Sequence, residues 1–183
     1  MTYKLKVAGI ERDLPLCPLN EKLKIAAFVV FGDVELTVKC AEALLKIAPE
    51  HDYMITAEAK GIPLIHEMAR QAGENEYFIA RKVAKLYMSG VFEAKVKSIT
   101  TEKEQHLFLD TAEADKIRGK RILIVDDVIS TGESLHAVEQ LVEKAGGTIV
   151  GRMAVLAEGD AAERKDIKFL EKLPLFNPDG SIK

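Results

Sequence analysis

Apolar and polar positions along the chain follow two alternating periods. Apolar residues recur at helical spacing in three segments, which are 36–47, 62–72 and 135–144. Short apolar runs that suit buried strands lie between them, at 53–56, 77–80, 122–125 and 148–156. Pro49 and the pair Gly146-Gly147 supply turn signals after two of the helical segments. Repeated strand–helix units predict an α/β fold, with a central parallel sheet flanked by helices.

Two segments do not fit this alternation. Residues 1–35 carry short strand-like and turn signals. Residues 86–110 form a long connection in which apolar and polar residues alternate around Val96, Ser98 and Thr100. Long irregular connections in compact domains are often lids over active sites. A chain of 183 residues is long enough for one sizeable core, so we expect residues 1–183 to form a single domain.

Two adjacent acids and a polar turn follow the apolar run 122–125. Asp126 and Asp127 come directly after it, where the carboxyl end of a parallel strand meets the ligand crevice. The next residues, Ser130-Thr131-Gly132-Glu133-Ser134, precede the helical segment 135–144. Backbone amides at such a helix start can hold a dianionic phosphate, with the hydroxyls and the close approach allowed by glycine. The alternative is that Ser130 or Ser134 simply caps the helix.

Charged residues follow two other predicted strands. Glu58-Ala59-Lys60-Gly61 lies between the apolar run 53–56 and the helical segment 62–72, in which Pro63 suits the first turn. Arg81, Lys82 and Lys85 come after the run that ends at Ala80. Alone, three cations in five residues are typical of a solvated surface. As the third charged group at a strand end, they indicate ligands for a polyanion.

The segment Ile122–Ser134 resembles, at every position, the signature of the type I phosphoribosyltransferases. This resemblance implies that Asp126 and Asp127 bind the ribose hydroxyls of phosphoribosyl pyrophosphate, while residues 130–134 hold its 5-phosphate. It also implies that two groups of residues contact pyrophosphate. One is the loop Glu58, Ala59, Lys60 and Gly61, with a cis peptide between residues 58 and 59. The other consists of the cations Arg81, Lys82 and Lys85. The cofactor implied is Mg²⁺, held mainly by the substrate.

The resemblance extends to the two segments outside the alternating core. It implies a small amino-terminal hood over the nucleobase at 1–35, and a flexible flap at 86–110 that closes over the substrate. A homodimer is implied in the same way, because family members often complete the site with a neighbouring subunit.

The base is harder to derive from the sequence. The run Arg81–Leu86 and the loop 58–61 resemble adenine phosphoribosyltransferases most. The flap lacks their Tyr-x-Leu-Glu-Tyr-Gly run, and residues 98–105 are closer to the flap of bacterial xanthine phosphoribosyltransferases. Glu102 or Glu104 could replace the missing catalytic acid, or both could be solvated flap residues. We predict a purine phosphoribosyltransferase with adenine favoured, and xanthine and hypoxanthine or guanine remain alternatives. Orotate fits less well as the base, because the phosphoribosyltransferases that use orotate have a different sequence pattern at the positions of residues 81–86.

A regulator is the alternative from another class. Lys60–Leu64, Ala157–Gly159 and Glu163-Arg164 resemble the effector domain of the purine operon repressor, which binds the same sugar phosphate without catalysis. That repressor carries an amino-terminal winged helix, for which residues 1–35 are too short and insufficiently basic. The sequence therefore favours an enzyme.

Composition narrows the setting. The 26 Lys and Arg against 29 Asp and Glu give a net charge of −3, which argues against a nucleic-acid partner. The two cysteines, Cys17 and Cys40, are too few for a disulfide framework. No apolar run is long enough to cross a membrane, and the first residues lack the apolar core of a signal peptide. We expect a cytoplasmic protein without a membrane partner.

Overall fold

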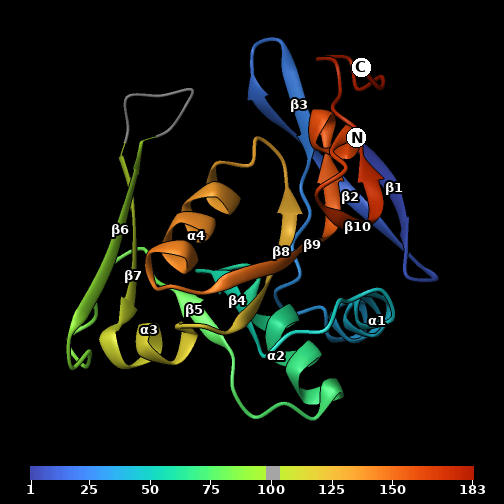
Figure 1. The fold of residues 1–183 in the computed structure, drawn as a ribbon. Helices are drawn as coiled ribbons and strands as arrows, with labels where there is room; N and C mark the ends of the chain where they lie inside the picture. The colour runs from blue at the N-terminus through green and yellow to red at the C-terminus, as the bar shows by residue number, and fades with distance from the viewer. Residues whose placement is uncertain (98–103) are drawn as a thin grey trace.

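A five-stranded parallel sheet forms the centre of the computed structural model, which describes residues 1–97 and 104–183 (Figure 1). The strand order is β10-β9-β8-β4-β5, and every neighbouring pair is parallel. The strands are β4 (Tyr53–Ala57), β5 (Phe78–Ala80), β8 (Arg121–Ile129), β9 (Thr148–Glu158) and β10 (Lys168–Leu173). The predicted α/β fold class is therefore confirmed.

Helices cover both faces of this sheet. Alternate residues of β8 point to opposite faces, so they pack against different helices. Leu123 and Val125 pack in one core cluster with α1 (Val34–Leu45) and α2 (Ile62–Ala72). Ile122 and Ile124 belong to a second cluster with α4 (Glu133–Lys144). Burial on both faces explains why this strand is continuously apolar in the sequence.

Local signals set the helix ends. The Asp33 carboxylate accepts a hydrogen bond from the Leu36 amide at 3.0 Å and begins α1. A capping box of Asp110 and Glu113 begins the short helix α3 (Thr111–Ile117). In contrast, α2 and α4 begin at Gly61 and Gly132 without a side-chain cap. Their first amides are therefore not occupied by a capping side chain.

The amino-terminal segment forms a separate antiparallel sheet, which we call the hood. It consists of β1 (Thr2–Val7), β2 (Ile10–Asn20) and β3 (Leu23–Ala26). The carboxyl-terminal tail joins it through the bridge between Lys24 and Phe176, and the buried Phe176 ring packs 5.2 Å from that of Tyr3. Both termini consequently lie at the hood (Figure 1).

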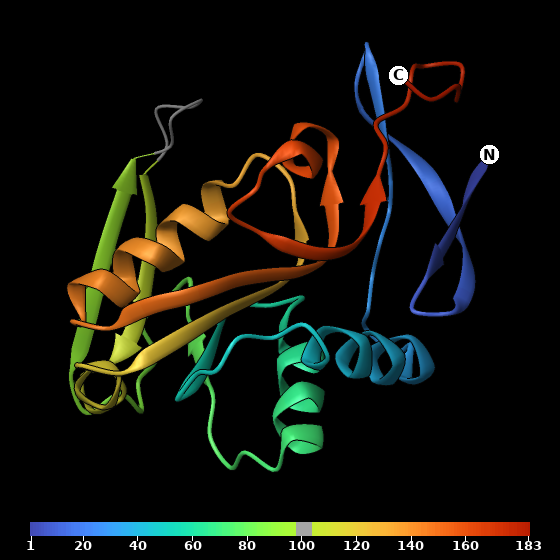
Figure 2. The ribbon, with the colours of Figure 1, turned by 45° about the vertical axis from the view of Figure 1, so that its right-hand side comes forward.

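A hairpin stands at the other end of the sheet. Strands β6 (Val91–Lys97) and β7 (Glu104–Asp110) pair antiparallel within the predicted flap segment. Figure 2 shows the hairpin and the hood on opposite sides of the central sheet. Phe108 and Arg81 exchange two backbone hydrogen bonds of 2.8 Å, which join the hairpin to the segment after β5.

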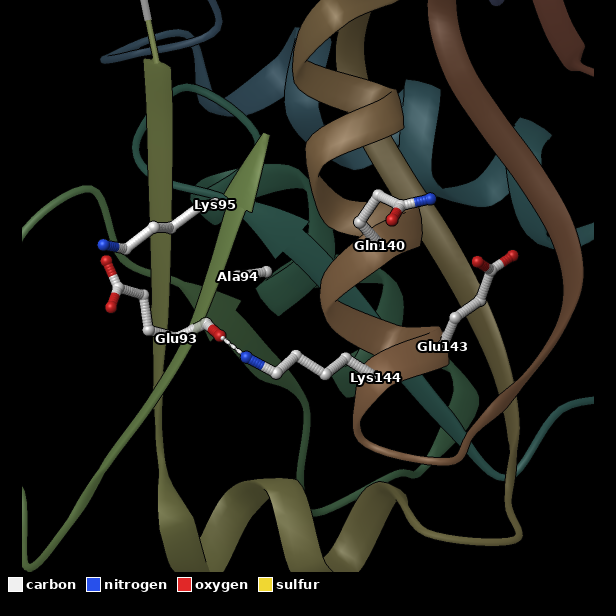
Figure 3. Close-up of a pocket in the computed structure, with 6 residues that line it drawn as sticks. All are labelled: Glu93, Ala94, Lys95, Gln140, Glu143 and Lys144. Atoms are coloured by element: carbon white, nitrogen blue, oxygen red, sulfur yellow. Dashed lines mark hydrogen bonds between the residues drawn. The ribbon is translucent and has the colours of Figure 1, made fainter. Parts of the chain in front are cut away.

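The hairpin also contacts the last turn of α4. Lys144 Nζ donates to the Glu93 carbonyl at 2.6 Å (Figure 3). It also lies 5.5 Å from the centre of the Phe92 ring. A hollow of about 430 Å³ opens here between β6 and α4, lined by Glu93, Ala94, Lys95, Gln140, Glu143 and Lys144. None of the residues predicted to bind substrate lines this hollow.

Some elements differ from the expectation. Strand β8 continues through both acids to Ile129, because β9 pairs with it as far as Ile129 and Ala157. Strand β10 and helix α3 have no counterpart among the predicted elements. Within the described residues, no helix combines the length and apolarity needed to cross a membrane.

Candidate functional site

A cleft of about 940 Å³ opens at the carboxyl ends of the central strands, beside the hood. Residues from the predicted groups line it together, namely Glu58, Ala59, Lys60, Lys82, Asp126, Asp127, Ser130, Thr131 and Ser134. Segments more than seventy residues apart in the sequence thus meet in one place, as expected for one edge of a parallel sheet.

Asp126 and Asp127 lie on the part of β8 that only β9 still accompanies, since the pairing with β4 stops at Ile124. The Asp126 Oδ1 atom accepts a hydrogen bond from the Asp127 amide at 2.9 Å. Asp127 is almost fully buried, and its Oδ2 atom accepts no hydrogen bond from any described residue. Its ion-pair partner is the exposed Lys60, so this buried oxygen can still accept a hydrogen bond from a ligand.

Burial and the neighbouring charge of Asp127 change the ionisation of Asp126. Removal from water, and then the charge of Asp127, raise the pKa of Asp126 well above its usual value. Lys60 opposes this effect, because its Nζ atom lies 3.3 Å from Asp127 Oδ2. Asp126 can therefore carry its charge most easily when cations or hydroxyl donors are close.

The polar turn after β8 encloses a small pocket of about 40 Å³, lined by residues 128–135 and Asp126. Gly132 lies there at φ 81°, a backbone conformation that favours glycine, and it is the N-cap of α4. Glu133 and Ser134 occupy the first turn. Free amides at a helix N-terminus suit a phosphate group, so the geometry fits the predicted 5-phosphate site.

Arg164 lies against this turn, and the sequence reasoning gave it no role. Its Nε and Nη2 atoms donate to Asp166 at 3.0 and 2.7 Å. Its Nη1 atom would lie only 2.7 Å from a Cβ atom built on Gly132. The Arg164 guanidinium, which Asp166 holds in place, thus lies directly against the backbone of the polar turn after β8.

The loop 58–61 has the predicted cis peptide between Glu58 and Ala59. Gly61 is buried at its end, where a Cβ atom would lie 2.1 Å from Thr56 Oγ1 and 3.5 Å from Asp126 Oδ1. Only glycine fits between these two side chains without displacing Thr56. Lys60 extends from the same loop to Asp127, so the loop and the acid pair are in direct contact.

The predicted cations surround Glu58. Arg81 Nη1 and Lys85 Nζ lie 3.5 and 3.4 Å from Glu58 Oε1, and the Lys82 amide donates to Glu58 Oε2 at 3.0 Å. The Lys82 amide, followed by Lys85 and Arg81, holds the pKa of Glu58 below its usual value. Lys82 lines the cleft, whereas Arg81 and Lys85 reach only its edge through Glu58.

One wall of the cleft is apolar, and sequence reasoning located it only as the general hood region. It comes from β2, β3, the segment after β3, and the chain around the end of β10, and consists of Leu19, Leu23, Ile25, Ala26, Ala27, Phe28, Val29, Leu173 and Leu175. Glu158, at the end of β9, also lines the cleft and was missed. A signal existed, since Glu158 directly follows an apolar strand, as Asp126 does.

The sequence offered two acids of the flap, Glu102 and Glu104, as candidate catalytic residues. Glu102 falls outside the described residues, and only the backbone of Glu104 is described, as the first residue of β7. Among the side chains that the structure describes, no group of three or more His, Cys, Asp or Glu is placed to bind a metal ion. Two adjacent carboxylates are available in the cleft, and Mg²⁺ commonly uses one or two carboxylates with substrate phosphates and water. The donor set thus fits a Mg²⁺ ion held mainly by substrate.

Comparisons with known proteins agree with this geometry. Residues 36–177 match the Phosphoribosyl transferase domain. The chain is 31% identical to adenine phosphoribosyltransferase of Thermotoga maritima, over 85% of this chain and 87% of that protein. It is 30% identical to hypoxanthine/guanine phosphoribosyltransferase of Methanothermococcus okinawensis, over 92% and 95%. In fold it is similar to adenine phosphoribosyltransferase from Thermoanaerobacter pseudethanolicus, with a TM-score of 0.70, 22% identity, and coverage of 87% of this chain and 95% of that one.

Proposed function

The chain belongs to the phosphoribosyltransferase family, in its purine branch, and on that basis we propose that it transfers the phosphoribosyl group from phosphoribosyl pyrophosphate to a purine, with adenine favoured. The products are the nucleoside monophosphate and pyrophosphate. The role would be purine salvage in the cytoplasm.

The observation that carries this proposal is the buried Asp127 Oδ2 atom, which accepts no hydrogen bond from a described residue and whose ion-pair partner, Lys60, is an exposed side chain. A ribose supplies two neighbouring hydroxyl donors, and adjacent carboxylates can accept from both. The small pocket at the start of α4 lies on the same cleft, since Asp126, Val128, Ser130, Thr131 and Ser134 line both spaces. A sugar held by the acids would therefore present its 5-phosphate to that turn.

The diphosphate fits the opposite end of the acid pair. Lys60 and Lys82 line the cleft, with Arg81 and Lys85 next to them on Glu58. In the proposed complex, diphosphate oxygens take the place that Glu58 and Asp127 now have beside these cations. Bound there, the side chains stabilise the negative charge that develops on the leaving group.

We propose Mg²⁺ as the cofactor, with Asp126 and Asp127 as the protein groups that would hold it beside substrate oxygens. When bound, the ion supplies positive charge to the diphosphate. The same two carboxylates orient the ribose and lie close to its anomeric carbon, which becomes cationic as the diphosphate leaves. Exclusion of water by the hairpin would protect that centre from hydrolysis.

The apolar wall and Val128 would hold the flat faces of the base. Adenine is favoured because the loop 58–61 and the run 81–86 resemble adenine phosphoribosyltransferases. The similarity to a hypoxanthine/guanine phosphoribosyltransferase over 92% of the chain supports 6-oxopurines as the second candidate substrates.

The experiment that tests the proposal measures nucleotide formation from phosphoribosyl pyrophosphate, with and without Mg²⁺, in parallel with adenine, hypoxanthine, guanine, xanthine and orotate. We expect AMP as the main product and no activity without the ion. A main product from orotate would contradict the purine assignment. No product from any base, together with tight binding of phosphoribosyl pyrophosphate, would instead support the regulator.

A further inference from the structure

Glu158 differs from the other carboxylates in the substrate cleft. Glu58, Asp126 and Asp127 each have a hydrogen bond or ion pair to a neighbouring residue. In residues 1–97 and 104–183, no hydrogen bond or ion pair involves the Glu158 side chain, although the residue is half-buried. Burial raises the pKa of this carboxyl, and the charge of Lys60 only partly opposes that effect. The fold thus keeps an unpartnered carboxyl against the cleft, at an energetic cost.

Glu158 lies between the apolar wall of the cleft and the part of the cleft that is lined by the loop 58–61. On one side it pairs in register with Leu173, and its neighbour Gly159 lies against Leu175, both from the apolar wall. Lys60, from the loop 58–61, lines the same cleft, and its charge acts on the Glu158 carboxyl. A purine has an apolar face and a polar edge. If its face rests on the apolar wall, its polar edge meets the border where Glu158 lies.

We propose that Glu158 determines specificity by accepting a hydrogen bond from the 6-amino group of the base, and that it thereby selects 6-aminopurines over 6-oxopurines. A carboxylate has acceptor oxygens only, so it pairs with an amino group and faces a carbonyl oxygen without a bond. Sites that hydrogen-bond a substrate group discriminate strongly against an analogue that leaves their polar atoms unpaired. This proposal rests on the proposed function and names its base class.

The test uses two matched pairs of bases, adenine with hypoxanthine and 2,6-diaminopurine with guanine. Both pairs exchange a 6-amino group for a 6-oxo group. In the wild type we expect a higher kcat/KM for the amino member of each pair. The variant Glu158→Gln keeps the shape but adds an amide donor that suits a carbonyl, so both ratios should fall by about tenfold, the equivalent of one modest hydrogen bond. Glu163→Gln is the control, because Glu163 is exposed and pairs with Lys172 outside the cleft.

A binding measurement separates this proposal from the proposed function. Calorimetric titration of AMP and of IMP needs no turnover, and the AMP preference should fall by the same factor in Glu158→Gln, with the affinity for phosphoribosyl pyrophosphate unchanged. If no base is converted but this change in preference is observed, the enzyme assignment fails and Glu158 keeps its role.

Three results would overturn the role of Glu158. The first is an unchanged ratio in Glu158→Gln. The second is a changed Mg²⁺ requirement at an unchanged ratio, which would assign Glu158 to the diphosphate. The third is no binding of either nucleotide to the wild type.

Discussion

Ionisation of Asp126 should make the stability of this protein depend on pH. Its pKa is raised above the usual 3.8 by burial and by Asp127, so the folded state binds that proton more tightly than the unfolded chain does. The resulting stabilisation is complete below the usual pKa and is lost as the pH rises through the raised one. Asp126→Asn does not titrate. We expect its melting temperature, relative to wild type, to be higher at about pH 8 than at about pH 5. A difference independent of pH, measured by calorimetry, would argue against a raised pKa.

The two acids together should be indispensable for turnover but not for folding. Changing Asp126 and Asp127 to Asn removes the carboxylates that we propose orient the ribose, and it also removes their mutual repulsion. We expect kcat/KM to fall by at least about 100-fold, while the circular dichroism spectrum stays that of the wild type. Unchanged turnover would refute the site assignment.

Gly61 should not tolerate even a methyl group. A Cβ atom there would lie 2.1 Å from Thr56 Oγ1, so Thr56 and the adjoining loop would have to move. We expect Gly61→Ala to lower the free energy of unfolding by about 1–3 kcal/mol, and to weaken pyrophosphate binding. The double variant with Thr56→Ala removes the clashing hydroxyl and should recover part of the loss in chemical denaturation. No recovery would indicate that the clash is not the cause.

At the level of elements, Arg164 in the segment after β9 should affect how tightly the proposed phosphate site binds its ligand. Arg164 lies against Gly132 and is held there by Asp166, so its charge is fixed beside the turn 130–134 that we propose binds phosphate. We expect Arg164→Gln to raise KM for phosphoribosyl pyrophosphate by about tenfold with little change in kcat. Asp166→Asn, which only loosens the guanidinium, should have a smaller effect in the same direction. A fall in kcat at constant KM would place Arg164 in the chemical step instead.

The elements that sequence patterns predicted are those whose burial is periodic. Strands β4 and β9 and helices α2 and α4 were expected close to their observed positions, since each has a continuous apolar run or an apolar helical face. Strand β10 was missed because it lies at the sheet edge with exposed Lys168 and Glu171 among its apolar residues. The extension of β8 through Asp126 was missed because polarity suggested a strand end, whereas pairing with β9 determines it.

The candidate site was predictable where its chemistry is local. Strand-end acids and cations were expected to meet at one edge, and the contacts of Lys60 with Asp127 and of Arg81 with Glu58 confirm that they do. Arg164 could not be found in this way, since its role depends on a close approach between segments thirty residues apart. The apolar wall could not be identified either, because scattered leucines in the hood have no distinctive spacing.

For the whole molecule, we expect a homodimer that buries the segment after β5. Val83, Leu86 and Tyr87 are strongly exposed apolar residues in the segment that carries the cations 81–85. Light scattering should show a dimer for the wild type. The double variant Leu86→Lys and Tyr87→Lys should be monomeric and have a higher KM for phosphoribosyl pyrophosphate. Ile182→Lys, at another exposed apolar site, in the tail, is the control that should stay dimeric. A monomeric wild type would contradict the expectation.

The hydrogen bond from Lys144 to the Glu93 carbonyl has a mechanical consequence. Helix α4 has twelve residues and is about 18 Å long, with the phosphate turn at one end and the root of the hairpin at the other. A helix of this length is stiff, so its two ends stay at a constant distance from each other. A tilt of the hairpin root would therefore be transmitted along α4 to the turn 130–134, where we propose that the 5-phosphate binds, so closing of the hairpin and binding of the substrate would be mechanically coupled.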